Sequence, residues 1–101
     1  MQPLQLLTAL RAIANDTITA CNRQEYKTGF VYQIHKDKLQ NMHNRVAKDV
    51  SLNKSIKAKY FSEIRKLSLA SMPVKDYTLI RQDISAKVLT LTPAIEFMKK
   101  R

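Results

Sequence analysis

The chain almost lacks the residues that interrupt helices. Its 101 residues include one glycine and three prolines, and strict alternation of apolar and polar residues is confined to a few positions around 88–92. A half-buried strand alternates apolar and polar residues. A helix is broken by an interior proline or by many glycines. The sequence therefore predicts an all-α protein, folded as a compact bundle of four to five short helices.

Apolar residues recur at helical spacing from Pro3 to about Cys21. At 100° per residue, one side of this segment carries Leu6, Leu7, Leu10, Ile13, Ala14, Thr17, Ile18 and Cys21. This pattern predicts a surface helix docked by one face. The polar segment 22–29 follows and ends in Gly29, the only glycine, which predicts a turn there.

A second helix is predicted from about Val31 to Val50. Its apolar arc consists of Val31, His35, Leu39, Met42, Val46 and Val50, and a separate polar arc consists of Lys38, Asn41, Arg45 and Lys48. Ser51, Asn53 and Ser55 then offer short polar side chains that can accept bonds from free backbone N–H groups. The segment after position 50 is thus expected to be a loop that begins another helix.

The third predicted helix, about 56–71, has two apolar sides. One side carries Ile56, Tyr60, Ile64 and Leu67, and the other carries Phe61, Leu69 and Met72. A helix with two apolar sides needs two neighbours, which means a central position or a subunit interface. We expect a homodimer, with Phe61, Leu69 and Met72 as interface residues.

Proline positions divide the last third of the chain. Pro73 is expected to end one helix, and a fourth is predicted from about Lys75 to Leu89, with an Asp83–Lys87 pair in the favourable i, i+4 order. Its inward residues are Tyr77, Ile80, Ile84 and Val88. Thr92 and Pro93 resemble the start of a short last helix over 94–99. A strand at 88–92 is the alternative.

Length and cysteine content limit the class of protein. The length suits one domain, residues 1–101, with a short basic tail at 99–101. A single cysteine cannot close a disulfide within the chain, which favours a reducing compartment. Neither a leader sequence nor an apolar run long enough for a membrane span is recognisable. We expect a soluble, cytoplasmic protein.

Positive charge is the strongest functional signal. The formal net charge is +10 and the pI is near 10.0, and residues 27–66 hold ten basic side chains against three acidic ones. Concentrated like charge opposes folding unless a polyanion neutralises it, and nucleic acid is the commonest polyanion. The candidate nucleic-acid-binding residues are Lys38, Asn41, Arg45, Lys48, Lys54, Lys57, Lys59, Arg65, Lys66, Lys99, Lys100 and Arg101.

The predicted binding mode is contact with successive phosphates, because no known DNA-binding motif is present. Asn41 lies between Lys38 and Arg45, and side chains of these types can also read base edges in a major groove. A lysine-rich face that is simply solvated is the competing interpretation. The leading hypothesis is a small regulatory or architectural accessory protein that binds DNA in preference to RNA, provided that the basic residues form one continuous outer strip.

The remaining chemistry is sparse. Cys21 and His35 lie on apolar arcs and are expected to be buried, and His43 lies two turns beyond His35, roughly 12 Å along a helix, too far to share a metal ion. Neither a phosphate-binding glycine loop nor a carboxylate pair is apparent. We expect no metal, no cofactor and no enzymatic activity.

A protein-interaction module is the alternative function. In this hypothesis a helical adaptor or inhibitor, comparable with accessory proteins of phages and plasmids, binds an acidic partner protein through its basic surface. Exposed Phe61, Leu69 and Met72 would fill a groove of that partner. Association with anionic membrane surfaces is a third, weaker reading, because the basic helices lack large aromatic and leucine faces.

Overall fold

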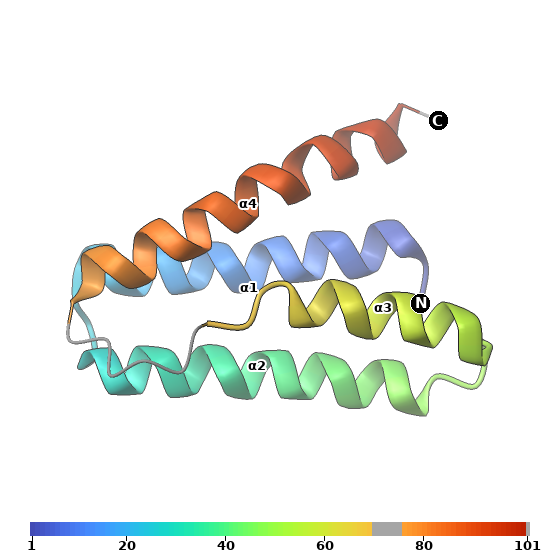
Figure 1. The fold of residues 1–101 in the computed structure, drawn as a ribbon, viewed down its shortest axis with the longest axis horizontal. Coiled ribbons are helices and arrows are strands. Elements are labelled where there is room, and N and C mark those ends of the chain that lie inside the picture. The colour runs from blue at the N-terminus through green and yellow to red at the C-terminus, as the bar shows by residue number, and fades with distance from the viewer. Residues whose placement is uncertain (70–75, 101) are drawn as a thin grey trace.

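The computed structural model describes residues 1–69 and 76–100. Within these residues it has no strand and four α-helices: α1 (Pro3–Arg23), α2 (Thr28–Lys48), α3 (Lys54–Arg65) and α4 (Tyr77–Lys99) (Figure 1). The all-α prediction is confirmed. The alternative of a strand at 88–92 is wrong, because these residues are part of α4.

Helix α1 is the centre of the molecule. It packs against each of the other three helices and most extensively against α4, while α2 and α3 lie side by side (Figure 1). The three neighbours share the face that the sequence predicts to be docked, and the opposite side of α1 is exposed, so the predicted docking by one face is confirmed. Its buried residues all belong to the predicted arc: Leu6, Leu7, Leu10, Ala14, Thr17 and Cys21.

The core has a large cluster and a small one. The large cluster joins all four helices, with Leu10, Val46, Ile64 and Ile95 among its buried members. The small cluster lies near the other end of α1, where Cys21 meets Val31 and Ile80. Apolar residues at helical spacing thus form the core as the sequence predicts.

The turn between α1 and α2 differs from the prediction. Gln24 takes the left-handed conformation there, with φ of 50°, and the backbone of Gly29 needs no positive φ. Gly29 lies in the first turn of α2. The only glycine of the chain is therefore not the turn residue. Helix α2 also ends before Val50, which is 98% exposed instead of belonging to the buried arc.

Helix α3 is shorter than predicted. Asn53 is its N-cap, as expected for one of the polar residues before it, and its side chain accepts a hydrogen bond of 2.9 Å from the Ile56 N–H. The helix ends at Arg65, and the backbone then turns so that Leu67 is buried and its carbonyl is available to His35. The predicted continuation beyond position 69 lies outside the described residues, as do Pro73 and the predicted helix start at Lys75.

Helix α4 is continuous through Pro93. The predicted start of a new helix at Thr92 is wrong, because the Thr92 hydroxyl instead donates to the Val88 carbonyl at 3.1 Å. Leu91 and Ile95, on either side of Pro93, are both buried in the main cluster. Their burial outweighs the missing backbone hydrogen bond, which costs about 3 kcal/mol in an unsupported helix. The Asp83–Lys87 pair forms at 3.1 Å as predicted.

A buried histidine joins α1, α2 and the segment after α3. His35 Nε2 lies 2.8 Å from the Leu67 carbonyl, and Nδ1 lies 2.6 Å from the Thr17 hydroxyl. A carbonyl can only accept, so Nε2 carries a proton, and in the neutral ring Nδ1 accepts from Thr17. Burial lowers the pKa of His35, and nearby Lys87 and Lys38 act in the same direction. The prediction of a core histidine is confirmed.

Candidate nucleic-acid interface and a neighbouring groove

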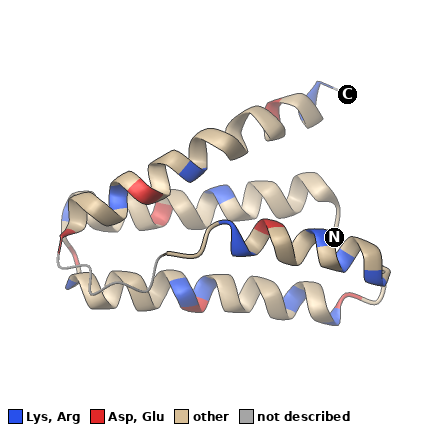
Figure 2. Ribbon diagram, in the orientation of Figure 1, with Lys and Arg blue, Asp and Glu red and all other residues tan. Residues whose placement is uncertain are grey.

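Basic side chains gather where α2 leads into α3. Five of the predicted site residues lie there, and we call them the basic end: Arg45, Lys48, Lys54, Lys57 and Lys59. Figure 2 shows Lys and Arg residues on both helices near this end of the molecule. Lys57 extends from α3 to the last turn of α2, where its Nζ donates to the Ala47 carbonyl at 2.8 Å. This hydrogen bond joins the start of α3 to the end of α2, and Arg45 and Lys48 line a hollow on the side of α1.

The one acidic residue at the basic end, Asp49, is engaged by other groups. Its carboxylate lies 2.6 Å from the amino group of Met1 and also accepts from the backbone N–H and the hydroxyl of Ser51. These hydrogen bonds, above all that from the amino group, lower the pKa of Asp49 to about 2. Among the described residues, no ion pair links Asp49 to a lysine or arginine, so the basic end keeps its charge.

The start of α3 adds to the positive potential. Its first turn contains Lys54 and Lys57 and no acidic residue. The N-terminus of a helix carries the positive end of the helix dipole, where acidic side chains are favourable and lysines are not. This local arrangement destabilises the isolated protein slightly and favours a bound anion.

The expected continuous strip does not form, because the other predicted basic residues do not extend the basic end, and the nucleic-acid hypothesis now depends on the basic end alone. Lys38 lies further along α2 and pairs with Asp16 of α1 at 3.2 Å, and Lys66 pairs with Glu63 at 2.9 Å. Arg65 lies beside α2 in a hollow with Lys36 and Gln40. Lys99 and Lys100 lie at the end of α4, Asn41 is exposed on α2, and Arg101 is outside the described residues.

Charge is therefore distributed unevenly along the molecule. Between residues 45 and 59 there are five basic side chains and one acidic one. Toward the opposite end, ion pairs link basic to acidic residues, as in Arg23–Glu25 at 3.4 Å and Lys87–Asp83 at 3.1 Å. Residues 45–59 therefore carry a local excess of positive charge, and none of their five basic side chains forms an ion pair with a described residue.

The three predicted interface residues have different surroundings. Phe61 is half-buried and stacks on His43 of α2, with ring centroids 4.2 Å apart. Leu69 is also half-buried and packs against the small cluster, and Met72 lies outside the described residues. Both described residues thus have neighbours within the chain, and the homodimer stays a prediction.

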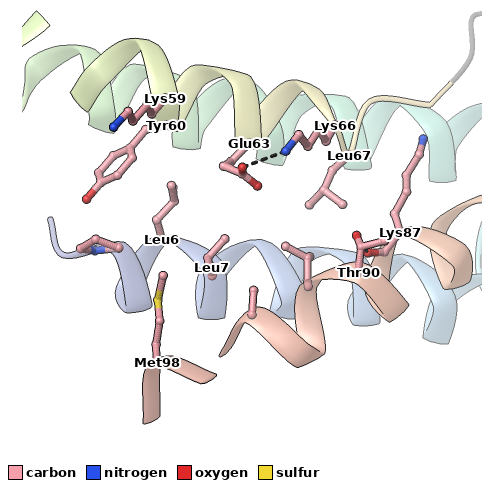
Figure 3. A pocket seen from close by; sticks show the side chains of 13 residues that line it. Leu6, Leu7, Lys59, Tyr60, Glu63, Lys66, Leu67, Lys87, Thr90 and Met98 are labelled. Carbon is pink, nitrogen blue, oxygen red and sulfur yellow. Dashed lines mark hydrogen bonds and ion pairs between the residues drawn. The ribbon is translucent and has the colours of Figure 1, made fainter. Parts of the chain in front are cut away.

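A groove runs between α3 and α4 across α1. Helices α3 and α4 each pack on α1 but have hardly any contact with each other, and the space between them is a cavity of about 450 Å³. Figure 3 shows Leu6 and Leu7 of α1 at its base, with side chains of α3 and α4 on its two walls. The groove could not be predicted from the sequence, because its residues come from three helices and the turn after α3 and share no local pattern.

The thiol and imidazole groups are placed as predicted. Cys21 is a buried free cysteine, and burial raises the pKa of its thiol. Over residues 1–69 and 76–100, no three His, Cys, Asp or Glu side chains are grouped so that they could hold a metal ion. In the same residues, none of the helices combines the length and the apolar character needed to cross a membrane.

No family model, curated protein or solved structure matches this chain.

Proposed function

We propose that this chain is a small accessory protein that binds nucleic acid, DNA in preference to RNA, through phosphate contacts at the basic end. The observation that carries the proposal is the unbalanced charge of residues 45–59, where five basic side chains face one acidic residue that is engaged by an amino group. Such a surface attracts the phosphate backbone without reading its sequence. A regulatory or architectural role fits a contact of this kind.

The unfavourable electrostatic energy of this arrangement supports the proposal. Lys54 and Lys57 stand at the positive end of the α3 dipole, and among the described residues neither Arg45 nor Lys48, in the last turn of α2, forms an ion pair. A phosphate bound there would relieve repulsion between the side chains and interact favourably with the helix N-terminus. Exposed Asn41 lies one turn before Arg45 and is the candidate for contact with a base edge.

The test is a titration of labelled DNA duplex, followed by fluorescence anisotropy, between about 50 mM and about 200 mM salt. We expect the logarithm of the affinity to fall linearly with the logarithm of salt concentration. In the double variant Arg45→Ala, Lys48→Ala, binding should weaken, and the slope should become shallower by about 1 for each phosphate that the variant no longer neutralises. RNA of the same sequence should bind more weakly.

The matched control removes the same charge from the opposite end of the molecule. Arg23 and Lys27 are exposed near the α1–α2 turn, so Arg23→Ala, Lys27→Ala should keep the slope of the unmodified protein. Equal weakening in both double variants would show that net charge alone attracts the duplex. Absence of binding at the lowest salt concentration would refute the proposal.

A further inference from the structure

The groove between α3 and α4 is largely apolar. Leu67 and Leu91 line it together with Met98, and Thr90 and Ala94 form part of the α4 wall (Figure 3). The apolar character continues outward along α4, because Phe97 follows Thr90 by seven residues, on the same helical face, and is 62% exposed. A protein surface rarely leaves an apolar hollow of this kind without a binding role.

Lysines predominate at the rim of the groove, although two of the three form ion pairs. Lys59, Lys66 and Lys87 line it, against Glu63 as the one acidic residue of the lining. Lys66 pairs with Glu63, and Lys87 is held by Asp83 and by the Ser68 carbonyl at 2.7 Å. Lys59 makes no ion pair with any described residue. An apolar floor with lysines on both walls complements a ligand that is apolar in the middle and acidic at its sides.

The shape of the groove indicates the kind of ligand. It is bounded by three helices, two of which flank the third with hardly any contact between them. A further helix laid across α1 would pack against all three, as amphipathic helices do when they bind in grooves. Its apolar residues would recur at i, i+3, i+4 and i+7, and acidic residues on its flanks would face the lysines.

We propose that this groove receives an acidic amphipathic helix of a partner protein. Charge decides between this ligand and a second copy of the chain, because each copy carries a net charge of +10 and two copies would repel each other across lysine-bearing rims. The groove lies apart from Arg45 and Lys48 and shares Lys59 with the basic end, and the proposal does not depend on nucleic-acid binding.

The test uses three labelled helical peptides of equal length. The first has leucines at i, i+3, i+4 and i+7 with glutamates on the flanks, the second has the same leucines with lysines, and the third has the glutamates with serines in place of the leucines. We expect the unmodified protein to bind the first at least about tenfold more tightly than either of the others. Equal binding of the first and second, or of the first and third, would overturn the proposal.

A pair of variants places the peptide in the groove. Thr90→Glu introduces a carboxylate on the α4 wall and should weaken binding of the acidic peptide about tenfold. Gln82→Glu makes the same change in charge at an exposed site of α4 outside the groove and should leave binding unchanged. Circular dichroism checks that both variants stay helical, and the peptide comparison with unmodified protein does not depend on them.

Two results would assign the groove differently. If Thr90→Glu binds the acidic peptide as tightly as the unmodified protein does, the peptide lies elsewhere. If sedimentation shows that the protein alone forms a dimer that Thr90→Glu dissociates, the ligand of the groove is a second copy. Either result overturns the proposal.

Discussion

His35 connects segments that lie far apart in the sequence. Its two ring nitrogens contact Thr17 of α1 and the backbone of Leu67, thirty-two residues further along the chain. The histidine itself could be predicted as buried, because it falls on the apolar arc with Val31 and Leu39. Its partners could not, since neither the end of α3 nor the position of Thr17 opposite α2 has a signal in the local sequence.

We expect acid to destabilise the fold through His35. Its pKa in the folded protein lies below the ordinary value of 6.5, so the unfolded chain takes up a proton that the folded chain resists. The free energy of unfolding should therefore fall as the pH drops through 6.5, by at most about 1.4 kcal/mol per pH unit for one group. Urea unfolding at about pH 7.5 and about pH 5.5 measures the difference.

The variants His35→Gln and His43→Gln separate this effect from other titrations. The first should be less stable at neutral pH and should lose most of the dependence between the two pH values. The second changes a half-buried histidine that stacks on Phe61 and should retain it. An unchanged pH dependence in His35→Gln would contradict the assignment.

Helix α4 shows how packing can override a local signal. Pro93 is exposed and interrupts the backbone ladder, yet Leu91 and Ile95 on either side are buried against α1. The inward residues of this helix could be predicted from their spacing, whereas its continuity could not, because a proline after a threonine more often marks a helix start. Helix α3 also ends earlier than its apolar pattern predicts, and the Leu67 carbonyl beyond its end accepts a hydrogen bond from His35.

Replacing the interior proline should stabilise the protein. In Pro93→Ala the new N–H can donate to the Leu89 carbonyl, and packing is preserved because the ring is exposed. We expect the free energy of unfolding to rise by about 1–3 kcal/mol, with a higher midpoint in thermal unfolding. A decrease would mean that the proline sets a bend in α4 on which the burial of Leu91 and Ile95 depends.

At the scale of the whole molecule, the grouping of positive charge lowers the stability of the fold. The grouping of basic residues between positions 45 and 59 could be predicted from the sequence, because α2 and α3 are adjacent and joined by a short loop. The absence of one continuous strip could not be predicted, because it depends on how the helices pack. In the structure Lys38, Arg65 and Lys66 lie on different sides of the molecule. The groove was missed because it exists only once α3 and α4 have packed on α1.

Because grouped positive charge lowers stability, we expect that removing part of it gives a variant that is more stable and binds DNA less tightly. Lys54→Glu places a carboxylate at the positive end of the α3 dipole and relieves repulsion within the basic end, so the free energy of unfolding should rise by about 0.5–1 kcal/mol at low salt. DNA binding should weaken in the same protein.

Lys36→Glu is the control, because it makes the same reversal of charge in the middle of α2, away from a helix end. It should raise the free energy of unfolding, measured with denaturant, by a smaller amount, and it should change the affinity for DNA little. If Lys54→Glu were instead the less stable of the two, the start of α3 would not carry the unfavourable potential assigned to it.

The central position of α1 has a consequence for synthesis. Among the described helices, the one translated first, α1, has its most extensive partner in the one translated last, α4. While the ribosome is still adding residues 77–99, Leu6, Leu10 and Ala14 have no α4 to cover them. The nascent chain therefore exposes an apolar face until residues 77–99 have left the ribosome, and native burial of α1 is completed only then.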